Sequence, residues 1–199
     1  VSYFQNENAV YRAAAVEAFA SIQDTASIET LSKLLDDKNN KVRKLSAYAL
    51  GQTYNEGALV KLKARLSIED SVAVRKVIWE AMGKCVTSET LNYFTTILIE
   101  DPLELEGYAW GIYRAGIKGV TNDTLVEKAV NLLYPNNTFE TRFAASNYLA
   151  RARNINVDNN LDGSVNIGKS SKLILNSVKP FQNGNLSNFF SNVSLSLKE

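Results

Sequence analysis

The stretch RAAAVEAFA at residues 12–20 decides the fold, because the chain repeats it with changes. The later copies read RKLSAYALG at 43–51, RKVIWEAMG at 75–83, EGYAWGIYR at 106–114 and RFAASNYLA at 142–150, and their starts lie 31 to 36 residues apart. The fourth position is mostly small, and the eighth is always large and apolar. A template that recurs in this way indicates a repeat protein, in which each unit packs against its neighbours.

Each unit is expected to contain two antiparallel helices. The repeated stretches are rich in alanine and carry apolar residues at helical spacing. A second amphipathic segment precedes each of the last four copies, at residues 28–35, 59–66, 91–98 and 125–133. The segment Val1–Gln5 reads as the end of a first-layer helix ahead of the first copy. The sequence therefore predicts an all-α protein, an α-solenoid of about five to six stacked helix pairs.

The repeat array is expected to occupy residues 1–153, and the composition changes after it. Residues 154–169 are polar, rich in asparagine and punctuated by glycine, which predicts a long loop. Residues 170–199 are expected to form one last degenerate helix pair or cap that lacks the arginine. The end units of solenoids are often atypical in this way, because they need a polar outer face.

The 199 residues include no histidine and a single cysteine, Cys85. Without histidine the chain cannot build a Ser-His-Asp triad, a Cys-His pair or a histidine metal site, and one cysteine cannot form a zinc or iron–sulfur cage. We therefore expect no catalytic constellation, metal site or cofactor, and a chain that is not an enzyme by itself. Cys85 is expected to be a small core residue.

Basic and acidic residues nearly balance, with 22 Lys and Arg against 21 Asp and Glu and a formal net charge of +1. Within residues 1–153 the two signs are equal in number. This balance argues against binding of nucleic acid, because surfaces that bind nucleic acid carry a basic patch. No run of apolar residues reaches the length of about 18 that a membrane-spanning helix needs, so no transmembrane segment is expected.

The repeats resemble HEAT repeats, in particular the short bacterial type first named from phycobilisome lyase subunits. The resemblance rests on an acidic or amide residue six positions before the start of each copy. The pairs are Asn6/Arg12, Asp37/Arg43, Glu69/Arg75, Glu100/Glu106 and Asn136/Arg142. The resemblance implies that the acidic residue caps the second helix of its unit and that the arginines form a ladder between units. Glu106 interrupts the arginines, and we expect it to contact Arg75 or Arg142.

The stretches YAWGIYR at 108–114 and RFAASNYLAR at 142–151 are also similar to HEAT arrays that precede the catalytic domain of some bacterial cyclophilin-type prolyl isomerases. Three hypotheses for function follow. The first is a non-catalytic scaffold that binds a protein or peptide on its concave face. The second is an accessory region of a larger enzyme, a prolyl isomerase or a chromophore lyase. The third is a nucleic-acid-binding HEAT array.

In HEAT arrays the second helix of each unit lines the concave face, so we expect binding residues on the repeated stretches, at positions four apart. The candidates are Lys44, Tyr48, Gln52, Lys76, Glu80, Lys84, Gly107, Tyr108, Gly111, Arg114, Asn147 and Arg151. Gly107 and Gly111 each cost about 1 kcal/mol relative to alanine inside a helix. Two interpretations of these glycines stay open: a floor for a bound backbone, or close packing on the neighbouring helix.

Trp79 and Trp110 occupy similar positions in consecutive copies. We expect them to pack in the core between repeats, with an anchoring role in binding as the alternative.

Overall fold

The computed structural model describes residues 2–152, and every regular element in this part of the chain is a helix. In chain order, with η for 3-10 helices, the elements are η1 (Ser2–Gln5), α1 (Ala9–Ile22), η2 (Thr25–Ser27), α2 (Ile28–Lys33), η3 (Leu34–Asp36), α3 (Asn40–Gln52), α4 (Glu56–Leu66), α5 (Val72–Cys85), α6 (Asn92–Thr96), α7 (Pro102–Ile117), α8 (Asp123–Asn131) and α9 (Phe139–Arg151). The predicted loop at 154–169 and cap at 170–199 lie outside the described residues.

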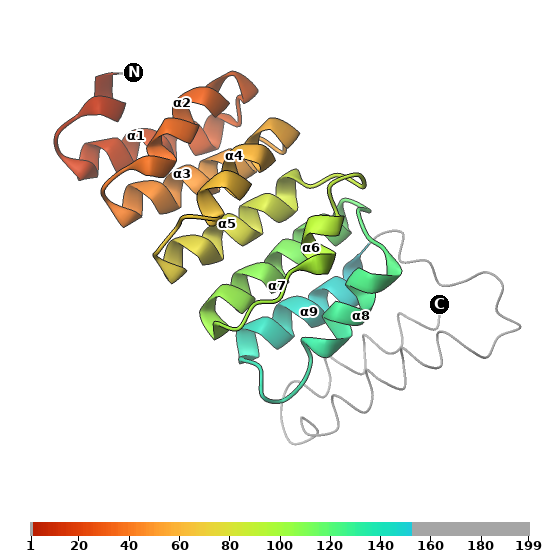
Figure 1. Ribbon diagram of the computed structural model, residues 1–199. Coiled ribbons are helices and arrows are strands. Elements are labelled where there is room, and N and C mark those ends of the chain that lie inside the picture. The colour runs from red at the N-terminus through yellow and green to blue at the C-terminus, as the bar shows by residue number, and fades with distance from the viewer. Residues whose placement is uncertain (1, 153–199) are drawn as a thin grey trace, which may run out of the picture.

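The helices form two layers (Figure 1). The repeated stretches form α1, α3, α5, α7 and α9, which lie side by side and are called the inner layer below. The helices α2, α4, α6 and α8 form the outer layer, and η1 packs on α1 as the outer element of the first unit. The stacking of these pairs confirms the predicted all-α solenoid.

The core lies between the two layers and runs without interruption from one unit to the next. The eighth position of the repeat supplies Leu50 and Met82, and the outer helices supply Leu31, Leu62 and Phe94. All five side chains are fully buried, and each contributes on the order of 2 kcal/mol by leaving water. The stack is therefore held by one continuous apolar seam.

Glycines let the inner helices α5 and α7 touch through their backbones. A Cβ atom at Gly107 would lie 2.1 Å from the backbone oxygen of Lys76, and one at Gly83 would lie 2.0 Å from that of Gly111. The outer helices make far fewer contacts with one another than the inner helices do. Because the inner helices are the more closely spaced, we assign the concave side of the stack to the inner layer.

The outer helix α6 is shorter than the segment predicted at 91–98 and ends at Thr96. The β-branched run that ends at Ile97 disfavours helix. In addition, the hydroxyl of Tyr108 donates to the backbone oxygen of Phe94 at 2.5 Å. That oxygen would otherwise accept the N–H four residues later, so a side chain from α7 replaces the next helical hydrogen bond.

The N-caps of the inner helices do not lie six residues before the start of the repeated stretch, and this part of the expectation was wrong. The residues that cap with their own side chains are Asn8, Asn39, Asp101 and Thr138. Asp37, which was expected to cap α3, accepts the backbone N–H of Asn39 at 2.8 Å. The carboxylate therefore holds the capping residue in place, and its remaining lone pairs face an arginine of the preceding unit.

Candidate functional site

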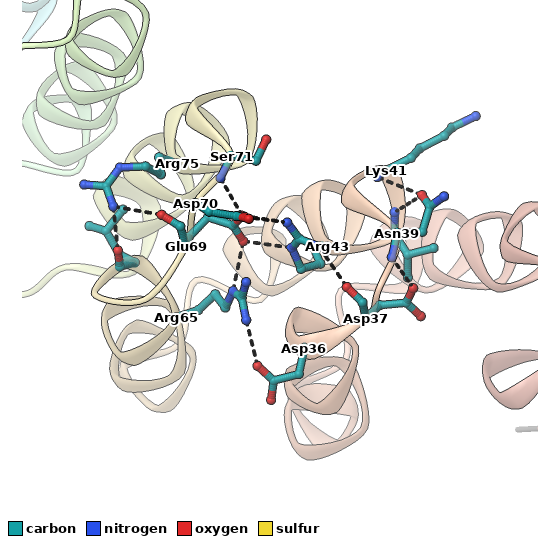
Figure 2. A network of polar contacts seen from close by, with 12 residues as sticks. Asp36, Asp37, Asn39, Lys41, Arg43, Arg65, Glu69, Asp70, Ser71 and Arg75 are labelled. Carbon is teal, nitrogen blue, oxygen red and sulfur yellow. Dashed lines mark hydrogen bonds and ion pairs between the residues drawn. The ribbon is translucent and has the colours of Figure 1, made fainter.

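An arginine ladder joins the first four units, and Figure 2 shows the part of it around Arg43 and Glu69. Arg43 donates through Nε and Nη2 to the two carboxylate oxygens of Glu69 at 2.9 and 2.7 Å, and through Nη1 to the backbone oxygen of Asp37 at 3.0 Å. The equivalent bidentate pairs are Arg12–Asp37 and Arg75–Glu104. Each arginine thus links its own unit to a carboxylate of the next unit, as the resemblance implies.

Glu69 is the most heavily engaged carboxylate of the ladder. Besides Arg43 it accepts Arg65 Nε and the backbone N–H of Ser71, both at 2.9 Å. Burial by itself would raise the pKa of Glu69, but the hydrogen bonds from Arg43, Ser71 and Arg65 outweigh it and lower the pKa to about 2. The ladder is therefore a structural device whose charges are already satisfied within the fold.

The structure corrects the expected role of Glu106. Arg75 pairs with Glu104 instead, and Trp79 Nε1 donates to the same carboxylate at 2.7 Å. Glu106 accepts Lys76 Nζ at 2.6 Å and the hydroxyl of Thr138 at 2.8 Å. Side chains two positions apart on an α-helix point about 200° apart around its axis. Glu104 therefore faces the ladder, while Glu106 faces away from it.

A second polar network runs along the surface of the inner layer, beginning on α3. Gln52 donates to the hydroxyl of Tyr48 at 2.8 Å and accepts Lys84 Nζ at 3.0 Å. The same ammonium lies 5.0 Å from the centre of the Tyr48 ring. Lys84 is only 6% exposed, and this burial lowers its pKa, an effect that the nearby Glu80 opposes.

The network continues across α5 and α7. Arg114 donates through Nε and Nη2 to one oxygen of Glu80, at 2.9 and 2.8 Å. Both side chains are about one-third exposed. The Lys76–Glu106 pair lies on the same two helices, two helical turns nearer the start of α7. These contacts join neighbouring units at the surface of the stack. The arginine ladder also joins neighbouring units, but its pairs are largely buried.

An aromatic cluster occupies the inner layer where α7 meets α9. The Trp110 ring lies 5.5 Å from Tyr113 and 6.1 Å from Phe143, and Phe143 stacks on Phe139 at 5.7 Å. Glu140 accepts Trp110 Nε1 at 2.6 Å, which fixes the orientation of the indole. The Phe139 side chain is exposed and the other three rings are partly exposed. The arrangement supplies rigid aromatic surface in contact with solvent.

The predicted binding residues divide into two groups. Those that are exposed or partly exposed are Lys44, Tyr48, Gln52, Lys76, Glu80, Arg114 and Arg151. Those that are buried are Lys84, Gly107, Tyr108, Gly111 and Asn147. The structure brings Tyr48, Gln52 and Lys84 together in one group, and Glu80 and Arg114 in the next. Lys44 and Arg151 reach solvent on α3 and at the last residue of α9.

The expectation that Gly107, Gly111 and Tyr108 line an open surface is corrected. Both glycines contact the backbone of α5, which supports the close-packing interpretation, and Tyr108 points into the core toward Phe94. Asn147 is buried too, and its side-chain amide donates to the backbone oxygen of Phe143 at 2.8 Å. α7 packs Gly107 and Gly111 on α5, while Trp110 and Tyr113 on the same helix are partly exposed.

Sequence reasoning missed the aromatic cluster, although two signals for it were present. Trp110 was expected in the core beside its counterpart Trp79, yet only Trp79 is buried there. Tyr113 follows Trp110 by three positions, and Phe143 follows Phe139 by four. Such spacings place two rings on one face of a helix.

A cleft of about 460 Å³ lies on the outer side of the stack, where α6 is short. Its walls include the end of α4, the start of α5 and the segment 97–101. Its polar lining consists of the ladder pair Arg75 and Glu104, of Tyr93, which stacks on Trp79 at 5.8 Å, and of Ser67, Glu100 and Asp101. The ladder engages the charges of Arg75 and Glu104, and Asp101 accepts the backbone N–H groups of Leu103 and Glu104 as the N-cap of α7.

Several classes of site are not found in the part of the chain that the structure describes. Residues 2–152 contain no group of three or more carboxylates or thiols placed to hold a metal ion. No helix in the same range is both long and apolar enough to cross a membrane. Cys85 is buried, and this burial raises the pKa of its thiol to about 11.

The comparisons with known proteins agree with this architecture. The family model of HEAT repeats matches residues 1–83. Among solved structures, the chain is similar to an engineered protein from the Northeast Structural Genomics Consortium, with a TM-score of 0.54 and 16% identity over 99% of this chain and 94% of that one. None of the curated proteins matches the sequence. Residues 1–83 match the HEAT family and the same helix pairing continues through Arg151, which supports a HEAT-repeat family and a helical repeat scaffold of a kind commonly used for protein interactions.

Proposed function

We propose that this chain is a non-catalytic scaffold that binds a protein or peptide segment along the surface of α3, α5, α7 and α9. The observation that carries the proposal is the aromatic cluster of Trp110, Tyr113, Phe139 and Phe143, whose rings reach solvent on the inner layer. Tryptophan, tyrosine and arginine are the residues that most often anchor protein interfaces, because they offer large contact area at low cost in conformational entropy.

Arg114 completes this surface. Its guanidinium lies 5.9 Å from the Trp110 ring and 5.6 Å from the Tyr113 ring, so a cation borders the aromatic area. Glu140 and Glu80 hold Trp110 and Arg114 by hydrogen bonds. Anchors that are already held in place lose little freedom when a partner binds, and this preorganisation favours affinity.

The charges on the inner layer support a protein partner over nucleic acid. Two of its cations, Lys76 and Arg114, are paired with the carboxylates of Glu106 and Glu80. Binding of a nucleic-acid strand needs a basic patch or stripe with several excess cations along it. Aromatic rings bordered by pairs of oppositely charged side chains are instead typical of a protein interface, which has an apolar centre and a polar rim.

A selection of displayed random dodecapeptides on the full chain tests this proposal. We expect enriched peptides whose affinity falls about tenfold or more in Trp110→Ala and Phe139→Ala, because truncation of an interface anchor has effects of this size. Tyr3→Ala is the matched control, since Tyr3 is an exposed aromatic residue on η1, at the other end of the array. Enrichment of no peptide, or equal affinity for wild type and Trp110→Ala, would contradict the proposal, as would tighter binding of a duplex DNA at the same residues.

A further inference from the structure

Beside the aromatic cluster, two cations lie near one carboxylate on the inner layer. The cations are Lys84 and Arg114, and the carboxylate is Glu80. Lys118 Nζ donates to the backbone oxygens of Lys84 and Val86 at 2.7 and 2.9 Å, at the end of α5. The group therefore carries an excess of positive charge, although the array as a whole is neutral.

The ammonium group of Lys84 is incompletely satisfied within the fold. It has three N–H donors, while the described residues offer it one neutral acceptor, Gln52 Oε1 at 3.0 Å, and the face of the Tyr48 ring. Lys84 is only 6% exposed, yet no carboxylate in residues 2–152 lies within salt-bridge distance of its Nζ. A buried cation normally has a partner of opposite charge. The site around Lys84 therefore lacks a carboxylate within salt-bridge distance.

The guanidinium of Arg114 supplies further N–H donors on the inner layer, next to Glu80. Its bonds from Nε and Nη2 both go to Oε1 of Glu80, and among the described residues the structure shows no acceptor for Nη1. Glu80 and Lys84 are four residues apart on α5, so they share one face of that helix. The guanidinium, which binds Glu80, and the ammonium of Lys84 therefore lie along the same face of α5 on the inner layer.

We propose that these two groups bind a carboxylate of an acidic peptide segment, while the residue beside that carboxylate packs on Trp110 and Tyr113. The proposal rests on the proposed function and names the chemistry of its partner. A carboxylate can accept from both donors at once, and it would supply the negative charge that the group around Lys84 lacks. The adjacent rings suit an apolar or aromatic neighbour in the peptide.

The test uses the peptides that the dodecapeptide selection enriches on the full chain. We expect Asp or Glu in these peptides beside an apolar residue. Replacement of that acid by its amide, Asp by Asn or Glu by Gln, should weaken binding about tenfold or more, as expected for loss of a charge-assisted hydrogen bond. In Arg114→Gln and Lys84→Met, the acidic and amide peptides should bind almost equally, because the acid has lost its partner.

Lys61→Gln is the matched control, since it removes one cation from an exposed pair with Glu29 on the outer layer. It should leave the preference for the acidic peptide unchanged. If Lys84→Met does not fold, Arg114→Gln decides the outcome, because its side chain is partly exposed. Equal affinity of wild type for acidic and amide peptides overturns this inference but leaves the proposed function intact. Binding that is insensitive to Trp110→Ala overturns the proposed function itself.

Discussion

The side chains of Arg43 and Glu69 are both buried, with exposures of 7% and 0%. Neither residue can be removed without leaving the charge of the other buried. The same holds along the ladder at Arg12 and Asp37, whose side chains are each 7% exposed. At the scale of single residues, stability therefore depends on matched pairs, in which the loss of one member costs more than the pair contributes.

Arg43→Met should lower the free energy of unfolding by about 3 kcal/mol, because Glu69 then keeps only Arg65 and a backbone N–H in a buried site. Urea denaturation followed by circular dichroism measures this change. Lys61→Met is the control, since exposed pairs contribute about 0–1 kcal/mol. A loss in Arg43→Met no larger than in Lys61→Met would mean that the ladder does not hold the units together.

The lowered pKa of Glu69 predicts a loss of stability in acid. Its pKa is about 2 in the folded chain against an ordinary value of 4.5, so the ionised form is favoured by folding. This contribution is fully present above pH 4.5 and is lost as the pH falls from 4.5 toward 2, with a total on the order of 3 kcal/mol. Denaturation measured at a series of pH values should show a shallower acid loss in Glu69→Gln than in wild type. Parallel profiles would contradict the assignment.

Cys85 should behave as a protected thiol. Burial raises its pKa to about 11, so at pH 8 the side chain is both protonated and out of contact with solvent. We expect reaction with Ellman's reagent to be slow in the native chain and fast in concentrated urea. A rapid reaction under native conditions would show that α5 does not pack against the preceding unit as described.

At the scale of elements, the glycines of α5 and α7 set how closely two inner helices approach. Gly107→Ala should destabilise the chain by more than 2 kcal/mol, since its Cβ would lie 2.1 Å from a backbone oxygen that cannot move without shifting α5. This loss should appear despite a gain of about 1 kcal/mol in helix propensity. Thermal unfolding measures the balance.

Gly57→Ala is the matched control for this prediction. Gly57 is exposed in α4, and its Cβ would meet only the side-chain oxygen of Asn55, at 3.0 Å. We expect this variant to remain within about 1 kcal/mol of wild type in either direction. If Gly107→Ala were as stable as Gly57→Ala, the backbone contact between α5 and α7 would be absent.

The pairing of helices could be read from the sequence, because the repeat returns the same apolar positions in every copy. The orientation of α7 could not, since Gly107 and Gly111 were compatible with an exposed floor as well as with close packing. That choice is made by contacts with Lys76 and Trp79 in another helix, which local patterns do not encode. The end of α6 was missed for the same reason, because the hydroxyl of Tyr108 takes a carbonyl that the helix would need to continue.

At the scale of the whole molecule, the array separates two kinds of polar contact. The ladder lies within the stack and joins neighbouring units, while the groups around Lys84, Arg114 and Trp110 lie on the inner surface. The candidate binding residues on α3 and α5 were chosen by repeat position, whereas those on α7 and α9 depend on which residues of α7 pack on α5.

The emission of Trp110 provides the most direct test that the inner layer is a binding surface. The chain has two tryptophans, and Trp79 is buried, so Trp79→Phe leaves Trp110 as the sole tryptophan, which can be excited selectively over tyrosine at about 295 nm or longer. We predict that titration of this variant with a selected peptide shifts or quenches the emission along a saturable curve. The dissociation constant should equal the one from the anisotropy of the labelled peptide. Binding by anisotropy with unchanged Trp110 emission would contradict the account.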